Sequence, residues 1–244
     1  MAASNPIKIV PLQGDALGAP VSAAHLTYRG GPLLQAAQVF VFFWGTAWEG
    51  QQAPLVQQVN QFFDFVLTSA LLDQMAEYSV AGISIGHGSR TGALILSTDP
   101  PATIADSDIQ ALIQQEITND SAVPQPTANT LYFVFLPPGV TVTVDGGTSC
   151  STLCGYHSDI NGKIYYAVMP YPDCAGCLRA FSVADALTVA SSHELCEAIT
   201  DPVPGQGWYD DQNGEIGDIC AWKSKKLGSV LVQLEWSNRA GQCI

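Results

Sequence analysis

Short runs of apolar residues, separated by segments rich in Gly and Pro, recur along the chain. The run from Val39 to Trp44 is continuous and is closed by Gly45, a pattern typical of a strand that is buried on both faces. Similar runs predict strands at 93–96, 130–136 and 164–169, and an alternating pattern predicts another at 230–236.

Three other segments have the spacing of helices. Between 53 and 78 the apolar residues recur every three or four positions, with Pro54 near the start. Residues 106–118 form a second amphipathic pattern. Ser182 is a plausible N-cap for a third helix, which should end before Pro202 because that proline disfavours helical geometry at the preceding residue.

Strands that alternate with helices predict an α/β fold with a mixed sheet. We expect a single domain over residues 1–244. Its first 37 residues, rich in Gly, Ala and Pro, are expected to form an extended lead-in. Cys, Gly and Asp become frequent from about residue 145, and the chemistry is expected in 145–244.

Composition narrows the class of protein. Of the 244 residues 47% are hydrophobic and 13% charged, which excludes a disordered chain. No window approaches the roughly 20 apolar residues of a membrane span, so no membrane partner is expected. A net charge of −13 with only nine Lys and Arg argues against nucleic acid as a partner.

Seven cysteines are present, five of them between Cys150 and Cys196. The spacings Cys-x3-Cys and Cys-x2-Cys could bind a structural zinc, but disulfides are the preferred interpretation because other features favour an extracellular protein. An odd number leaves one thiol free or paired between chains. The N-terminal residues have neither the basic nor the apolar region of a signal peptide.

The segment Ser192-His193-Glu194-Leu195-Cys196-Glu197 carries the main functional signal. His193 and Glu197 are four residues apart on an expected helix, so both side chains share one face and can bind one ion. Glu194 would lie beside the ion and could deprotonate a bound water. This is the logic of the His-Glu-x-x-His zinc peptidases with Glu in place of the second His, and zinc accepts carboxylate ligands.

The rest of this helix supports a metal site. From 181 to 200 the only charged residues are Asp185, Glu194 and Glu197. A solvated helix face would also carry Lys and Arg. An imidazole and carboxylates in an otherwise apolar helix indicate a buried polar site that a cation neutralises.

A catalytic zinc usually has three protein ligands, so one more is required. On an unbroken helix Asp201 would lie roughly 12 Å from His193 along the axis, but a helix break at Pro202 could return it as a ligand or as support for one. Glu215 and Asp218 follow Glu197 by 18 and 21 residues. The candidates are Asp218, favoured narrowly, then Asp201 and Glu215, with His157 as the remaining imidazole.

Two further expectations concern this region. The segment 210–215, rich in acidic and amide oxygens around Gly214, could bind Ca²⁺ as well. We also expect strand 164–169 to be an edge strand that pairs with an extended substrate. Tyr156, His157 or one of the tyrosines of that strand could donate a hydrogen bond to the developing oxyanion, and Tyr165 and Tyr166 should point to opposite faces.

Two blocks of sequence resemble the plant phosphate-induced, exordium-like secreted proteins. They are the segment 27–34 ahead of a Phe-Trp-Gly strand, and the cysteine-rich block Cys150-x3-Cys154-Gly155-Tyr156-His157 followed by Cys174-x-Gly176-Cys177. The resemblance implies an extracellular protein with disulfides among Cys150, Cys154, Cys174 and Cys177. His-Glu-x-x-Glu departs from that family and, with Thr200-Asp201-Pro202, looks like uncharacterised microbial zincin-like proteins.

The sequence therefore predicts a secreted zinc metallopeptidase with a zincin-like active-site helix. His193, Glu197 and a downstream carboxylate would hold Zn²⁺, Glu194 would act as general base, and the substrate would be a protein or peptide. The alternative is a non-catalytic extracellular binding or signalling protein with a structural metal.

Overall fold

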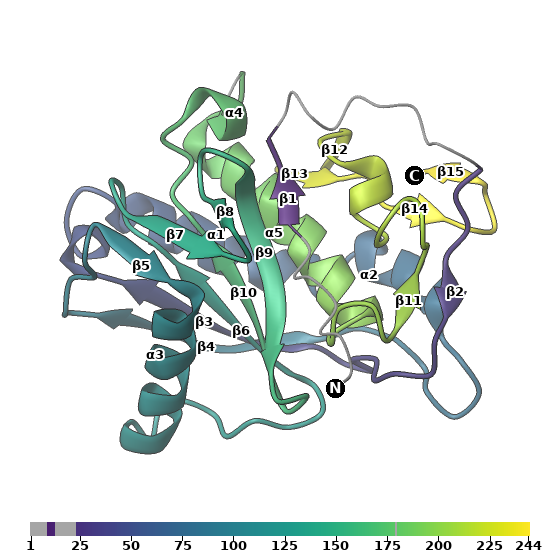
Figure 1. Cartoon of the computed structure of the whole chain (residues 1–244), viewed down its shortest axis with the longest axis horizontal. Helices are drawn as coiled ribbons and strands as arrows, with labels where there is room; N and C mark the ends of the chain where they lie inside the picture. Colours follow the sequence, from purple (N-terminus) through teal and green to yellow (C-terminus); the bar gives the residue numbers. More distant parts are fainter. Residues whose placement is uncertain (1–8, 13–22, 179) are drawn as a thin grey trace.

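A computed structural model describes residues 9–12, 23–178 and 180–244 of the chain. It confirms a single α/β domain with a mixed sheet. The main sheet has the order β1-β9-β10-β6-β3-β4 (Figure 1). Strands β3 (Gln38–Trp44), β4 (Ser89–Leu96), β6 (Thr130–Phe135) and β10 (Ile164–Met169) are parallel, and β9 (Leu153–Ile160) and β1 (Ile9–Pro11) complete the sheet in antiparallel pairing.

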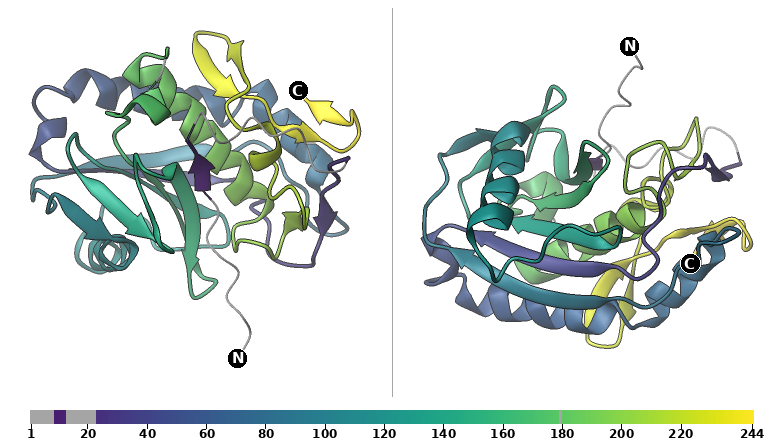
Figure 2. Two further views of the ribbon diagram at one scale, coloured as in Figure 1. Left: turned by 45° about the horizontal axis from the view of Figure 1, so that its top comes forward. Right: turned by 90° about the horizontal axis from the view of Figure 1, so that it is seen from below.

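Helices and small strands cover both faces of this sheet (Figure 2). One face packs against α1 (Ala53–Val66), α2 (Ala70–Met75) and α5 (Val183–Thr200). The other packs against α3 (Asp106–Asn119) and the small sheet of β5 (Thr103–Ala105), β7 (Thr141–Val144) and β8 (Gly147–Thr148). Because both faces are covered, β3 and β6 are apolar along almost their whole length.

Most of the expected strands and helices are found close to their predicted bounds. The strand expected at 230–236 is instead two short strands in different sheets, Val230–Gln233 and Trp236–Ser237. The segment predicted as one helix over 53–78 divides into α1, α2 and the 3-10 turn η2 (Ala76–Tyr78). Strand β4 begins four residues earlier than expected, at Ser89. Tyr165 and Tyr166 do point to opposite faces, since each belongs to a different core cluster.

Two expectations about strands are wrong. Strand β10 is not an edge strand, because β9 and β6 flank it on either side. The first 37 residues are not merely an extended lead-in: in their described part, β1 joins the main sheet and β2 (Thr27–Tyr28) pairs with β11 (Trp208–Tyr209). Residues 1–8 and 13–22 lie outside the described part.

The C-terminal part of the chain, from residue 218 onward, packs against α5. Its elements are η3 (Asp218–Cys220), the hairpin β12–β13 (Ser224–Leu227 and Val230–Gln233) and the pair β14–β15 (Trp236–Ser237 and Gln242–Cys243). The remaining elements are η1 (Thr46–Trp48) and α4 (Ala175–Leu178). Strand β13 packs against α5, so the helix lies between the main sheet and this C-terminal layer (Figure 1).

Six of the seven cysteines form disulfides, which confirms the disulfide interpretation. The pairs are Cys150–Cys174, Cys154–Cys177 and Cys220–Cys243, while Cys196 is free and buried in α5. Three disulfides indicate an oxidising environment outside the cytosol. Among the described residues, no helix has the length and apolar character needed to cross a membrane.

Candidate metal centre

Helix α5 presents the predicted polar residues to the interior. Ser182 caps its N-terminus by accepting a hydrogen bond from the backbone N–H of Asp185 at 3.1 Å, as expected. The helix ends at Thr200, one residue before the Asp-Pro pair. Every residue from Ala186 to Thr200 is buried, including His193, Glu194 and Glu197, which are each 0% exposed.

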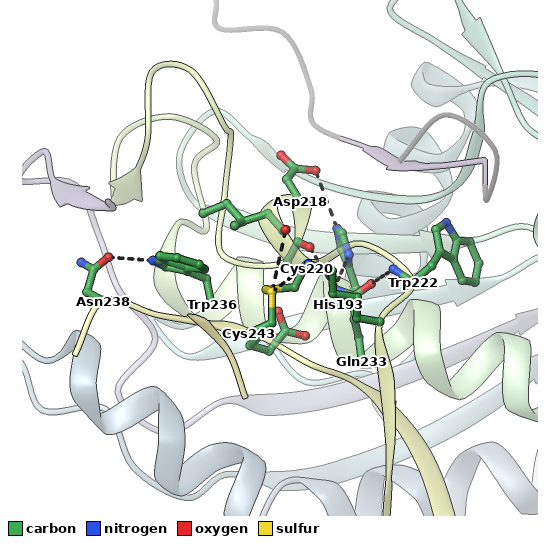
Figure 3. The surroundings of a disulfide bond; sticks show 12 residues. His193, Asp218, Cys220, Trp222, Gln233, Trp236, Asn238 and Cys243 are labelled. Carbon is green, nitrogen blue, oxygen red and sulfur yellow. Dashed lines mark hydrogen bonds and ion pairs between the residues drawn. A yellow bond between two sulfur atoms is a disulfide. The ribbon is translucent and has the colours of Figure 1, made fainter. Parts of the chain in front are cut away.

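His193, Glu197 and Asp218 form the first group of potential metal ligands. Nε2 of His193 lies 3.0 Å from Oε1 of Glu197 and 4.0 Å from Oδ1 of Asp218, and one atom from each side chain lies within 4.8 Å of the other two. Figure 3 shows Asp218 facing His193 from the loop that also holds Cys220. Asp218, the favoured candidate for the third ligand, therefore lies close enough to His193 and Glu197 to share an ion with them, and its role as a ligand stays a prediction.

The geometry between His193 and Glu197 fits a shared cation. Nε2 of His193 has no hydrogen-bond partner, although Oε1 of Glu197 is only 3.0 Å away. The ring nitrogen therefore does not aim at the oxygen. Ligand atoms that share an ion at about 2.1 Å are themselves about 3–3.5 Å apart and aim at the ion, not at each other.

Gln233 of β13 orients the ring of His193. Its Oε1 accepts a hydrogen bond from the backbone N–H of Trp222 at 2.9 Å, and its Nε2 donates to the carbonyl of Gly217 at 3.0 Å. The amide nitrogen thus faces Nδ1 of His193 at 2.9 Å (Figure 3). A neutral ring then accepts at Nδ1 and carries its proton on Nε2, so that proton must leave Nε2 before a cation can bind there.

A second group lies on the other side of Glu197. Nδ1 of His157, on β9, lies 3.0 Å from Oε2 of Glu194 and 3.5 Å from Oε2 of Glu197, and its Nε2 lies 3.5 Å from Oε1 of Glu215. His157, Glu197 and Glu215 can again offer ligand atoms within 4.8 Å of one another. The candidate Glu215 is therefore also in the site, but in this second group.

Burial and the neighbouring charges shift the pKa values of the two histidines and of Glu197 in opposite directions. Burial alone would lower the pKa of both imidazoles, but the carboxylates around them raise it well above the usual value. Glu215 has the largest raising effect on His157, and Glu197 has the largest raising effect on His193. Burial would raise the pKa of Glu197, yet the two imidazoles hold it at about 2. Burial raises the pKa of Glu215 well above its ordinary value.

Two predicted site residues have other roles. The carboxylate of Asp201 accepts backbone N–H groups from Gly205, Gln206 and Gly207, and Asp201 belongs to neither ligand group. It anchors the loop after α5, and its carbonyl contacts Nε2 of His157 at 3.2 Å. Asp201 therefore lies beside the candidate ligands and not among them. This agrees with the second of the two roles that the sequence allowed for Asp201, which was support for a ligand.

Tyr156 does not reach the site. It neighbours His157 on β9, so its side chain lies on the opposite face of the sheet, where its hydroxyl donates to Oδ1 of Asp106 at 2.7 Å. His157 is itself 0% exposed and contacts Glu194. Neither residue is placed as the free oxyanion donor that the sequence suggested, and that expectation is wrong for Tyr156.

The expected calcium loop is organised by its own hydrogen bonds. Oδ1 of Asp210 accepts the backbone N–H groups of Gln212 and Asn213 at 2.8 and 2.9 Å, and its Oδ2 accepts the N–H of His25 at 2.7 Å. Glu215 turns away from this loop into the second ligand group. Calcium binding at 210–215 stays a prediction.

Two glycines permit the close packing of the site. A Cβ atom at Gly217 would lie 2.8 Å from Nδ1 of His193 and 2.9 Å from Oε1 of Glu197, and one at Gly155 would lie 2.8 Å from the Met169 side chain and 3.3 Å from Oε1 of Glu194. Strand β1 lies beside Gly155, with Val10 paired to it and 0% exposed. Sequence reasoning missed Gly155, Gly217, Gln233 and β1, because nothing in their local pattern points to His193 or Glu194.

Comparisons with known proteins add little to this picture. No protein-family model matches the chain, and no curated protein matches it. Among the solved structures that match is one described as the structure of a chaperone–substrate complex, with 16% identity over 66% of this chain and a TM-score of 0.29. This chain spans 25% of that chain, and a likeness this weak carries no argument about fold or function.

Proposed function

We propose that the chain is a secreted zinc-dependent metallopeptidase. The observation that supports this most is the group His193, Glu197 and Asp218, whose ligand atoms converge while Nε2 of His193, 3.0 Å from Oε1 of Glu197, has no hydrogen-bond partner. An unpartnered buried polar atom is costly, and a cation bound to it removes that cost. The acidic ligand set suits a divalent ion, and zinc is the proposed one.

Zinc bound there would polarise a carbonyl group and lower the pKa of a water molecule. Glu194 is the proposed general base, because its Oε1 has no hydrogen-bond partner and its Oε2 is held by His157 at 3.0 Å. Glu194 would take the proton of the attacking water and pass it to the leaving amine. Gln233 would hold the imidazole of His193 in place, and Asp201 would anchor the loop beside His157.

One observation favours the alternative, a non-catalytic extracellular protein with a structural metal. His157, His193, Glu194, Glu197 and Glu215 are all 0% exposed, and only the side chain of Asp218 is partly exposed, at 18%. A structural metal site is closed, whereas a catalytic one keeps a position open to water and substrate. A catalytic site would therefore require β1 and the residues around it to move apart and admit water and substrate, whereas a structural site would not.

The variant Glu194→Gln separates the two functions. In a peptidase it should keep its zinc, measured by elemental analysis, and lose cleavage of casein or a peptide library by at least about 100-fold, the scale of a general base. Glu49→Gln, which changes an exposed carboxylate, is the matched control and should cleave normally. A zinc-containing wild type without any cleavage would support the structural metal, and undiminished turnover by Glu194→Gln would reject the mechanism.

A further inference from the structure

The two oxygens of Glu197 face two different histidines. Oε1 lies 3.0 Å from Nε2 of His193, and Oε2 lies 3.5 Å from Nδ1 of His157. The two rings come from different elements, α5 and β9, and approach the carboxylate from its two ends. A carboxylate placed between two imidazoles in this way has the arrangement of a bridging ligand.

Each histidine has a second carboxylate of its own. Asp218 accompanies His193, with Oδ1 at 4.0 Å from Nε2, and Glu215 accompanies His157, with Oε1 at 3.5 Å from its Nε2. The two groups of three share only Glu197. Each has the imidazole and carboxylate ligands that divalent metals such as zinc and manganese accept.

The charge balance asks for more than one cation. One ion among His193, Glu197 and Asp218 would leave both oxygens of the fully buried Glu215 without a hydrogen-bond partner, and with them Oε2 of Glu197. In the described part of the chain the buried polar residues include no Lys or Arg, so the imidazoles of His157 and His193 are the only buried groups that can offset the charge of the carboxylates. Two imidazoles cannot neutralise the five buried acidic residues Glu194, Glu197, Asp201, Glu215 and Glu235. Buried carboxylates without a compensating charge are strongly unfavourable.

We propose that the centre holds two divalent cations bridged by Glu197. One is bound by Nε2 of His193 and by Asp218. The other is bound by Glu215 and by Nε2 of His157, because Nδ1 of His157 holds Oε2 of Glu194 at 3.0 Å. One ligand atom each of His157, Glu197 and Glu215 lies within 4.8 Å of the other two. This proposal deepens the proposed metallopeptidase and rests on it for the ion at His193. It also gives the β9 histidine a ligand role in place of the oxyanion role expected from the sequence.

Metal stoichiometry tests the proposal without an activity assay. The full chain, refolded from urea with its disulfides intact in excess Zn²⁺ and then freed of unbound metal, should contain two zinc ions per molecule by elemental analysis. Glu215→Gln and Asp218→Asn should each contain one, and Glu197→Gln should lose most of both. Glu49→Gln is the control and should keep two. Circular dichroism and free-thiol counts confirm that each variant is folded.

A second measurement covers a variant that fails to fold. Loaded with Mn²⁺, the wild type should give the electron paramagnetic resonance signal of a spin-coupled pair, and Glu215→Gln should give that of an isolated ion. If the wild type and Glu215→Gln both contain one ion per molecule and both give the resonance signal of an isolated ion, the two-ion centre is overturned and the proposed function still stands. No bound metal at all in the wild type overturns both.

Discussion

Glu235 is fully buried near Gln233, and neither of its carboxylate oxygens makes a well-formed hydrogen bond. Burial raises the pKa of this carboxyl well above its ordinary value; the nearby imidazole of His193 opposes the shift and the carboxylate of Glu197 adds to it. At low pH the group is neutral in the folded and unfolded states alike. As the pH rises above the unfolded value, only the unfolded chain ionises freely, and the folded state loses stability.

Replacing Glu235 with Gln should therefore raise the free energy of unfolding in a pH-dependent way. The metal-free variant should gain about 1–3 kcal/mol over the metal-free wild type on going from pH 4 to pH 8, the usual scale for an unsatisfied buried polar group. Urea unfolding at both pH values measures the change. Glu49→Gln should show little difference between the two, and an equally small change in Glu235→Gln would contradict the argument.

At the scale of single residues, the sequence was sufficient to predict which side chains share a face when both belong to the same helix. The four-residue spacing of His193 and Glu197 is fixed by helical geometry, so their common face could be stated in advance. Glu215 and Asp218 follow a loop whose path depends on tertiary contacts, such as those of Asp201 with residues 205–207. Sequence spacing alone could therefore not assign them to separate ligand groups.

Among the elements, the longer ones with a clear period were predicted, whereas β9 and the short alternating strand β7 were not. The sequence of β9, Leu153-Cys-Gly-Tyr-His-Ser-Asp-Ile, neither alternates cleanly nor forms an apolar run. It is a strand because it pairs with both β10 and β1, and its polar His157 is buried against Glu194 and Glu197 of α5. Missing this strand made β10 look like the edge of the sheet.

The disulfide Cys220–Cys243 ties the short element η3, which begins at Asp218 and ends at Cys220, to β15. The double variant Cys220→Ser/Cys243→Ser should lose about 3 kcal/mol of stability, as expected for a loop of this length. It should also bind zinc more weakly, because Asp218 is no longer held against His193. Urea unfolding and competition with a zinc indicator measure the two effects.

Cys150→Ser/Cys174→Ser is the matched control for this prediction. Cys150 and Cys174 are 24 residues apart in the sequence, and Cys220 and Cys243 are 23 apart. Neither Cys150 nor Cys174 is next to a proposed ligand in the sequence. The control should lose similar stability and keep its zinc affinity. Equal zinc affinity in the two double variants would show that η3 holds Asp218 without the disulfide.

At the scale of the whole molecule, the beginning of the chain covers its candidate centre. Strand β1 pairs with β9 beside Gly155, and the carbonyl of Pro11 accepts a hydrogen bond from the indole of Trp222 at 2.7 Å. Without β1, β9 would be the edge strand, able to pair with an extended peptide next to Glu194. In this structure that position is filled.

Deleting residues 2–12 should therefore increase peptide cleavage by the proposed enzyme while the zinc content stays unchanged. Cleavage of a peptide library and elemental analysis measure the two quantities, and a rise in kcat/KM of at least about tenfold is expected if access limits the rate. Deleting only residues 2–7 leaves β1 in place and is the control. A truncated chain that is no faster than the control would show that β1 serves stability alone.

The burial of every proposed ligand except the partly exposed Asp218 has a consequence for the origin of a metal bound there. A cation enclosed between α5, β9 and the C-terminal layer can exchange with the surroundings only when these elements separate. A metal bound there would be acquired while the chain folds and kept afterwards, so the ions that surround the nascent protein would decide its content more than affinity does. Molecules folded in zinc-rich and in manganese-rich media should therefore carry different ions long after both are moved to the same buffer.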